Sequence, residues 1–164
     1  MENADEYIRR GLGTNVICQV GVIVRDIERS VEAYSQILGL PKPPIVVTDE
    51  PEFAHTRYRG KPTKARAKLA FFAMGQVSLE LIEPVGSPST WQEFLDERGE
   101  GVHHIAFIVK DTDQVVQYLE GQGLEVVQRG DYTGGRYTYV DSASALGVVL
   151  ELLENFETQP DKAD

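Results

Sequence analysis

The sequence predicts an α+β fold built from two tandem copies of one unit, each with the order strand, helix, strand, strand, strand. Two pairs of similar segments support this prediction. The segment QVGVIVRD at 19–26 resembles HIAFIVKD at 104–111, and VSLELIE at 77–83 resembles VVLELLE at 148–154. Because four segments recur in the same order, an internal repeat explains them better than chance similarity does.

Composition and charge limit the class of protein. With 164 residues, 41% of them hydrophobic, the chain has enough apolar surface for a core. The formal net charge of −10 argues against a nucleic-acid partner, which requires a basic face. The single cysteine, Cys18, excludes an internal disulfide, and no apolar run approaches the roughly 18 residues of a membrane span. We therefore expect a cytoplasmic protein with no nucleic-acid and no membrane partner.

The first unit follows a polar N-terminal tail at 1–14. Residues 16–24 are rich in β-branched side chains and predict a strand. Asp26 is a candidate N-cap for the helix that follows, and Gly39 is a candidate for its end. The remaining strands of this unit are predicted as a hairpin at 69–74 and 77–82.

A breaker-rich linker at 85–100 separates the two units and contains a short helix. Ser89 or Thr90, followed by Glu93, resembles the capping box that starts such a helix. The domain is therefore expected to span 15–154, with module one at 16–84 and module two at 101–154.

The second unit repeats the pattern after Gly101. Residues 103–109 predict a strand, Asp111 or Thr112 a helix cap, and Gly121 and Gly123 the end of that helix. Further strands are predicted at 124–127, 136–140 and 147–153, and a polar C-terminal tail at 155–164.

One polar side chain interrupts an otherwise apolar strand face in each of four strands. Since successive side chains of a strand alternate between faces, Leu79 and Leu81 face one way and Glu80 the other. The four polar residues occupy equivalent positions of the two units: Gln19, Glu80, His104 and Glu151. A buried carboxylate without a partner costs several kcal/mol. Two carboxylates, a glutamine and a histidine at equivalent positions therefore suggest one shared partner, and a divalent cation is the simplest candidate.

On these residues the chain resembles the vicinal oxygen chelate superfamily, the group of glyoxalase I and methylmalonyl-CoA epimerase. The resemblance covers nearly all of the chain except its tails. It implies two βαβββ modules that form a cupped mixed β-sheet around one divalent metal ion, with helices on the outer face, and it implies a homodimer. Carried over position by position, the metal ligands are Gln19, Glu80, His104 and Glu151. The donor set leaves the ion open among Zn, Ni, Co, Mn, Mg and Fe.

The resemblance implies an enzyme that transfers a proton alpha to a carbonyl through a metal-stabilised enediolate. It makes Glu151 the first choice for the catalytic base and Glu80 the second. The chain departs from glyoxalase I at Ile23, where that enzyme has an arginine for glutathione. It departs from the epimerase at 61–64, where that enzyme has an acidic residue.

We therefore expect a methylmalonyl-CoA epimerase-like enzyme acting on a small anionic or oxo-acid substrate. A glyoxalase I-like isomerase (lactoylglutathione lyase) is one alternative, and a non-catalytic binding protein like those of bleomycin resistance is another. An oxygenase would prefer two histidines and one carboxylate, so Gln19 argues against that class.

Basic side chains between 57 and 68 stand out in this acidic chain. Arg59, Lys64 and Arg66 are candidates for docking an anionic substrate such as a phosphate, a carboxylate or CoA. The alternative is a solvated strand edge, where positive charge discourages edge pairing. Arg136, beside a predicted turn, is a further candidate for substrate binding, with a plain hairpin turn as its alternative. We expect His103 to be structural or to face solvent.

Overall fold

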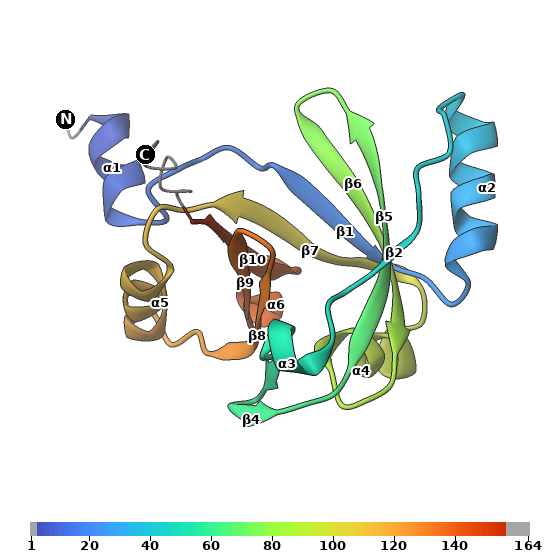
Figure 1. Ribbon diagram of the computed structural model, residues 1–164. Coiled ribbons are helices and arrows are strands. Elements are labelled where there is room, and N and C mark those ends of the chain that lie inside the picture. The colour runs from blue at the N-terminus through green and yellow to red at the C-terminus, as the bar shows by residue number, and fades with distance from the viewer. Residues whose placement is uncertain (1–2, 157–164) are drawn as a thin grey trace, which may run out of the picture.

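The computed structural model describes residues 3–156 and shows one curled mixed β-sheet with helices packed around it (Figure 1). The strands are β1 (Gln19–Ile23), β2 (Val46–Val47), β3 (Arg57–Tyr58), β4 (Lys61–Pro62), β5 (Arg66–Met74), β6 (Val77–Val85), β7 (Gly101–Ile108), β8 (Val126–Tyr132), β9 (Gly135–Val140) and β10 (Val149–Asn155). Their order across the sheet is β2-β5-β6-β1-β7-β10-β9-β8-β3-β4. The predicted fold class is confirmed.

The helices are α1 (Ala4–Arg10), α2 (Ile27–Leu38), α3 (Pro51–Ala54), α4 (Thr90–Arg98), α5 (Thr112–Gly121) and α6 (Ala143–Leu146). Asp26 and Asp111 cap α2 and α5 in the same way, since each carboxylate accepts a 3.0 Å hydrogen bond from a backbone N–H of the first turn. Gly39 ends α2 with a φ of 67°, a conformation that glycine adopts without strain. None of these helices is long and apolar enough to cross a membrane.

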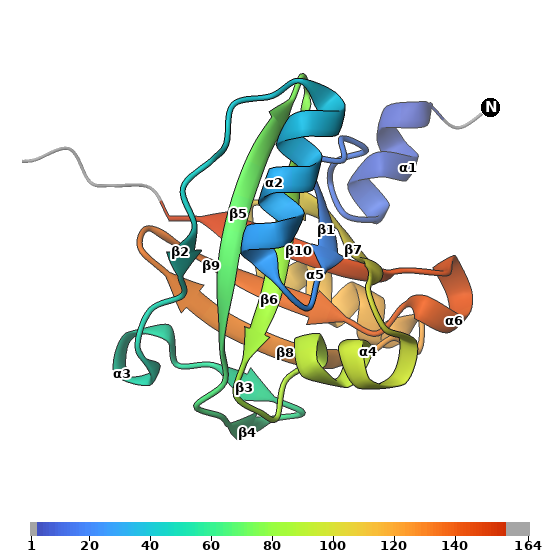
Figure 2. The same ribbon diagram turned by 90° about the vertical axis from the view of Figure 1, so that its right-hand side faces the viewer.

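The internal repeat determines the order of the central strands. β1 runs parallel to β6, and β7 runs parallel to β10. β1 and β7 are antiparallel neighbours, so the two repeat units meet along these two strands at the middle of the sheet. The segment α3-β3-β4 departs from this symmetry, because β3 comes from the first half of the chain but pairs with β8 of the second (Figure 2).

The outward faces of the central strands are covered by one helix from each unit. Figure 1 shows α2 and α5 on opposite sides of the molecule, each outside its own part of the sheet. Val31 of α2 packs with Leu81 of β6, and Val115 of α5 packs with Leu152 of β10. Because strand side chains alternate, Glu80 and Glu151 must then point to the inner, concave face. The helices thereby fix which residues face the concave side.

Several short elements were not predicted. α3, β3, β4 and α6 have two to four residues each, too few to show a periodicity in the sequence. β8 continues to Tyr132 beyond the predicted 124–127, because Gly130 and Asp131 pair with Tyr137 and Arg136 of β9. These features depend on contacts between distant segments. The parts of the predicted tails at 1–2 and 157–164 lie outside the described residues.

Leu81 and Leu152 occupy equivalent positions and are both fully buried, so Leu81→Ala and Leu152→Ala should destabilise the protein similarly. We expect each to lower the free energy of unfolding by about 2–5 kcal/mol, measured by urea denaturation. Ile37→Ala serves as the control, because Ile37 is 80% exposed and should change stability by no more than about 0.5 kcal/mol. Equal stability of all three variants would contradict this packing.

Candidate metal centre

The four predicted ligands come from four adjacent strands and meet on the concave face. Glu80 of β6 and His104 of β7 both lie beside Gly21 of β1 in the register of the sheet. Gln19 of β1 and Glu151 of β10 both lie beside Ala106 of β7. The repeat relates the first set of neighbours to the second. The first and last strands of each unit therefore contribute one polar residue each to the same site.

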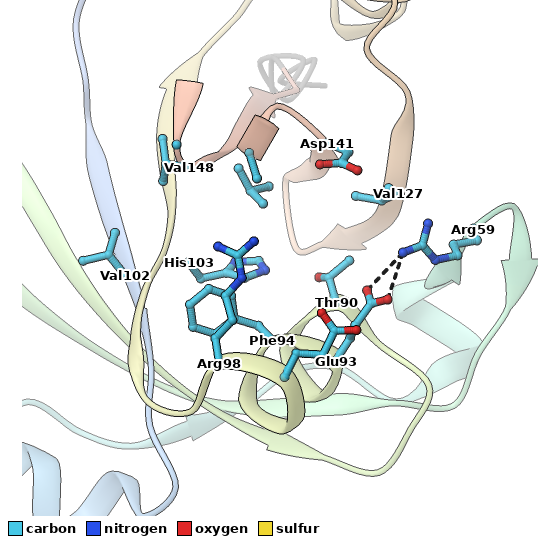
Figure 3. Close-up of a pocket in the computed structure, with 14 residues that line it drawn as sticks. Arg59, Thr90, Glu93, Phe94, Arg98, Val102, His103, Val127, Asp141 and Val148 are labelled. Carbon is cyan, nitrogen blue, oxygen red and sulfur yellow. Dashed lines mark hydrogen bonds and ion pairs between the residues drawn. The ribbon is translucent and has the colours of Figure 1, made fainter. Parts of the chain in front are cut away.

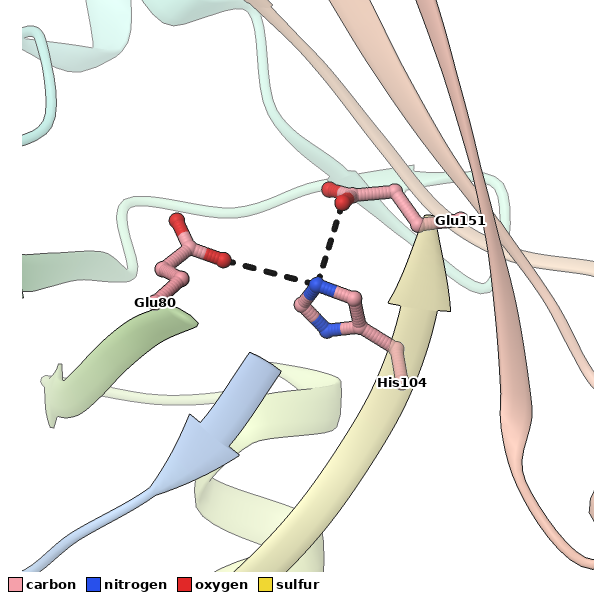
Figure 4. A group of neighbouring side chains, drawn as sticks. All are labelled: Glu80, His104 and Glu151. Carbon is pink, nitrogen blue, oxygen red and sulfur yellow. Dashed lines mark ion pairs between the residues drawn. The ribbon is translucent and has the colours of Figure 1, made fainter. Parts of the chain in front are cut away.

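The polar atoms of these side chains lie within hydrogen-bonding distance of one another. Nε2 of His104 is 3.0 Å from Oε2 of Glu151 and 3.4 Å from Oε2 of Glu80, and both carboxylates point toward it in Figure 4. Nε2 of Gln19 donates to the same oxygens, at 2.8 Å for Glu80 and 3.2 Å for Glu151. The four residues singled out from the sequence therefore lie together in the structure, and their binding of a metal ion stays a prediction.

Small residues make room for the long side chains. A Cβ atom on Gly21 would lie 2.0 Å from Cε1 of His104, so only glycine fits beneath this imidazole. Ala106 is the repeat equivalent of Gly21, is fully buried, and lies beside Gln19. A glycine within a strand often marks such a close approach. Gly21 was not identified from the sequence, because the pairing of β1 with β7 has to be known before its role is visible.

A β-bulge brings a second histidine to the site. The register between β1 and β7 shifts after Gly21, which pairs with His104, while Val22 pairs with Val102, so His103 is the extra residue. Nδ1 of His103 is 3.0 Å from Nδ1 of His104. His103 is buried, so the expectation that it is structural holds and a solvent-facing position is wrong. Strict strand alternation places neighbouring residues on opposite faces, which is why the sequence did not predict this contact.

His103 can determine which nitrogen of His104 is free. Burial, together with the charges of His104 and Arg98, holds the pKa of His103 well below its usual value, so His103 is neutral. If Nε2 of His104 binds a metal ion, Nδ1 must carry the proton and donate it to Nδ1 of His103. A hydrogen bond to the other ring nitrogen is the usual way in which proteins orient a ligating histidine.

The carboxylates control the protonation of the site. Burial alone would lower the pKa of His104, but Glu151 and Glu80 outweigh it and raise that pKa to about 10. Burial raises the pKa of Glu80. Both carboxylates are nearly inaccessible to solvent, with 6% exposure for Glu80 and 3% for Glu151. Without a metal ion, the protonated imidazole is the positive charge that compensates them.

The donor atoms fit a divalent cation. Glu80, His104 and Glu151 each offer one ligand atom, and these atoms lie within 4.8 Å of one another. Ligand atoms bound about 2.1 Å from one ion lie about 3.0–3.4 Å apart, which agrees with the separations given above. Gln19 presents its amide nitrogen to the carboxylates, and half a turn of the amide would present Oε1, a metal ligand, instead. Two carboxylates would balance the charge of the ion.

A cavity of about 410 Å³ opens above these side chains. Its floor includes Gln19, Glu80 and Glu151, and its walls come from both halves of the sheet. The remaining wall residues are Val46, Val47, Thr48, Asp49, Ala54, Thr56, Leu69, Phe71, Trp91, Asp131, Tyr132, Tyr137, Tyr139 and Leu153. The volume suits a small molecule, and the ligands lie where such a molecule would reach them.

The basic residues predicted to bind substrate do not line this cavity. Arg59 lies at a separate cavity of about 160 Å³, which His103 also lines, and donates to Glu93 at 2.9 Å (Figure 3). Lys64 is exposed.

The other two basic residues are held by neighbouring groups. Arg66 forms a 2.6 Å ion pair with Glu50 and donates to the backbone oxygen of Thr48. Arg136 lies 3.5 Å from Asp131 and stacks over Phe156. The structure therefore brings the four predicted metal ligands together and places the four predicted substrate-binding residues elsewhere.

The chain is similar to several known proteins. Residues 18–140 match the sequence profile of the Glyoxalase/Bleomycin resistance protein/Dioxygenase superfamily. A 2-epi-5-epi-valiolone epimerase of Actinomyces sp is 29% identical over 153 residues, which cover 88% of this chain and 82% of that enzyme. The uncharacterized protein YqjC of Bacillus subtilis strain 168 is 29% identical over 143 residues, covering 85% and 92%. A variant of Streptomyces coelicolor methylmalonyl-CoA epimerase in complex with 2-nitronate-propionyl-CoA is 26% identical, with a TM-score of 0.60 and coverage of 85% and 96%.

Gly21→Ala should displace the imidazole of His104 and weaken metal binding about 10–100-fold, as titration calorimetry with Mn²⁺ or Zn²⁺ would measure. The matched control is Ala106→Gly, the equivalent position of the other unit, where the change removes a methyl group and creates no clash. We expect the control to retain the affinity of the wild type. Equal affinities for both variants would show that the position of His104 is unimportant.

Metal binding should release a proton. In the metal-free protein His104 has a pKa of about 10 and is protonated at neutral pH, whereas binding through Nε2 requires the neutral ring. Metal affinity should therefore rise with pH between about pH 6 and about pH 9. Calorimetry in buffers of different ionisation enthalpy measures the proton released, and the exposed His55→Gln variant should behave as the wild type. Binding without proton release would contradict the assigned ligand.

Proposed function

Because this chain belongs to the Glyoxalase/Bleomycin resistance protein/Dioxygenase superfamily, we propose that it is a metal-dependent epimerase that transfers a proton alpha to a carbonyl group. The observation that carries the proposal is a pair of buried carboxylates, one from each repeat unit, on either side of a site that fits one divalent cation. Two of the similar proteins bear the name epimerase, which agrees with this assignment.

Four side chains of this chain would hold the ion: Gln19 through Oε1, His104 through Nε2, and the carboxylates of Glu80 and Glu151. When bound, a divalent cation acts as a Lewis acid that polarises a substrate carbonyl and makes the neighbouring C–H bond more acidic. The residues of the cavity then have to bind the substrate, remove a proton from one face of that carbon and return it to the other.

Inverting the configuration of one carbon requires one group to remove its proton and another to return a proton from the opposite face, and two carboxylates can fill these roles. Glu151 of β10 and Glu80 of β6 line the cavity from opposite repeat units, so they can approach a substrate carbon from different sides. We assign Glu151 as the base that removes the proton and Glu80 as the group that returns it. Burial raises the pKa of Glu80, so this carboxyl group holds a proton more readily than an exposed glutamate does.

Aromatic side chains can orient the substrate and exclude water. Nε1 of Trp91 donates to the hydroxyl oxygen of Tyr139 at 3.0 Å, and within residues 3–156 the hydroxyl proton of Tyr139 has no acceptor. Burial raises the pKa of Tyr139 well above its usual value, so the hydroxyl stays neutral. Tyr139 is therefore suited to donate a hydrogen bond to a substrate oxygen rather than to act as a base.

The two alternatives make different use of the same residues. A glyoxalase I-like isomerase would move the proton between neighbouring carbons, and a binding protein would transfer none. Both buried carboxylates favour a proton-transferring enzyme over a binding protein, because a binding function does not require them. A homodimer and a cytoplasmic location stay predictions.

The proposal is tested by hydrogen exchange in D2O with metal-loaded protein. The probes are acetoin, methylmalonyl-CoA and the hemithioacetal of methylglyoxal with glutathione, which cover a hydroxyketone epimerase, a CoA-ester epimerase and an isomerase. We expect metal-dependent deuterium incorporation at the carbon next to the carbonyl, with loss of its configuration, in at least one epimerase probe. Conversion of the hemithioacetal alone would support the isomerase, and no exchange in any probe would contradict the proposal.

Glu151→Gln and Glu80→Gln should each slow exchange from a different enantiomer of the active probe, by about 10²–10⁴-fold. Chiral chromatography of each enantiomer after exchange measures this effect. Glu125→Gln, an exposed carboxylate, is the control and should retain full activity. Metal content is measured for each variant, and equal loss for both enantiomers with normal metal content would contradict the two-base assignment.

A further inference from the structure

No basic side chain of the described residues lines the cavity above the proposed metal ligands. Of the described residues that line it, none is a lysine or an arginine, while four are acidic: Asp49, Glu80, Asp131 and Glu151. Small anions are usually held in proteins by charge-assisted hydrogen bonds from arginine or lysine. A cavity with this lining offers an anionic substrate no cation apart from the metal ion.

The charge that remains after metal binding is negative. Glu80 and Glu151 would balance a divalent cation, which leaves Asp49 and Asp131 as the charged groups of the wall. Asp131 is compensated by Arg136 at 3.5 Å and also lies within hydrogen-bonding distance of His55, at 3.1 Å. Asp49 forms no hydrogen bond or ion pair with any residue of the described part of the chain. A carboxylate or phosphate entering the cavity would therefore meet a like charge at Asp49, which is exposed and is screened by solvent rather than by a neighbouring cation.

β5, which contributes Leu69 and Phe71 to the wall, also carries two basic side chains that are already paired with acidic ones. Arg66 is fixed by Glu50 and by the backbone of Thr48, a residue of the cavity wall. Lys68 of the same strand forms a 2.8 Å ion pair with Glu83. These contacts show that Arg66 and Lys68 connect β5 to neighbouring segments. To bind an anion instead, either side chain would first have to leave its carboxylate.

The rest of the wall is apolar or aromatic, and part of it is open to solvent. Val46 and Val47 of β2 are 46% and 49% exposed, and Phe71 of β5 is 41% exposed. A substrate that covers these side chains gains about 25 cal/mol per Å² of apolar surface removed from water. Tyr137 and Tyr139 supply neutral hydroxyl groups deeper in the cavity. The wall therefore suits an apolar body with a few neutral oxygen atoms.

We propose that the substrate is an uncharged α-hydroxyketone with an apolar substituent, and that the cavity selects against carboxylates, phosphates and CoA thioesters. This inference rests on the proposed function for the position of the reacting carbonyl. The carbonyl oxygen and the neighbouring hydroxyl oxygen would be the two atoms that approach the ion held by the four side chains. The apolar substituent lies against β2 and β5, where the exposed valines and phenylalanine are found.

Two probe molecules of similar shape but different charge test whether charge determines binding in the cavity. 2-Hydroxyacetophenone and phenylglyoxylate have the same phenyl ketone body and each offers two adjacent oxygen ligands, but only phenylglyoxylate is anionic. Binding is followed by water-proton relaxation of the Mn²⁺-loaded protein, which reports displacement of metal-bound water and does not depend on turnover. We expect 2-hydroxyacetophenone to bind at least tenfold more tightly than phenylglyoxylate or methylmalonyl-CoA.

A charge reversal at the wall tests the cause of this selectivity. Asp49→Lys should shift the ratio of the two affinities toward phenylglyoxylate by about threefold or more at low ionic strength. Glu120→Lys, which changes the net charge equally but lies exposed on α5 and outside the cavity wall, should leave the ratio unchanged. An equal shift in both variants would show a general charge effect and overturn the role of the wall.

The outcomes distinguish this inference from the proposed function. If phenylglyoxylate or methylmalonyl-CoA binds as tightly as the hydroxyketone, or if the hydroxyketone does not bind, the substrate class is overturned. Deuterium exchange into methylmalonyl-CoA would in that case still support the epimerase. Selective binding of 2-hydroxyacetophenone without exchange of its α-hydrogens would support the cavity's selectivity and contradict the catalytic role.

Discussion

Two carboxylates are buried on the concave face, on either side of His104, and the rest of the site has to compensate their charge. Glu80 and Glu151 lie inside the protein, where an anion without a partner costs several kcal/mol. The protonated His104 compensates them in the absence of a metal ion, with Gln19 donating to both. Gly21 is the residue that lets this imidazole reach the carboxylates. The bulge in β7, the glycine beneath it and the helices outside the sheet all maintain this arrangement.

The repeat explains why the site can face a substrate from two sides. Each unit contributes one carboxylate from its last strand and one nitrogen-bearing side chain from its first, and the units meet along β1 and β7. A carbon bound between the two carboxylates is accessible to a base on either side. The cavity walls do not share this symmetry, because α3 and Val46–Val47 come from the first half and Tyr132–Tyr139 from the second. Under the proposed function, the symmetric part of the fold would serve proton transfer and the asymmetric part would serve recognition.

The convergence of Gln19, Glu80, His104 and Glu151 and the main elements could be predicted because both depend on local periodicity and on the repeat. Strand alternation identified Glu80 and Glu151 as inward-facing without knowledge of any contact. The role of His103 could not be predicted, because it depends on a bulge in the pairing of β7. The ion-pair partners of Arg59 and Arg66 could not be predicted either, because Glu93 and Glu50 approach them only in the folded chain. A basic stretch in the sequence shows where cations lie, whereas their function depends on which anions lie beside them.

The most direct measurement of the central claim is anomalous diffraction from crystals grown with Mn²⁺. We expect one anomalous peak about 2.0–2.3 Å from Nε2 of His104 and from an oxygen of Gln19, Glu80 and Glu151, with the amide of Gln19 turned to present Oε1. His104 should keep its Nδ1 contact with His103. A site without a peak at saturating Mn²⁺, with His104 still bonded to Glu151, would contradict the account.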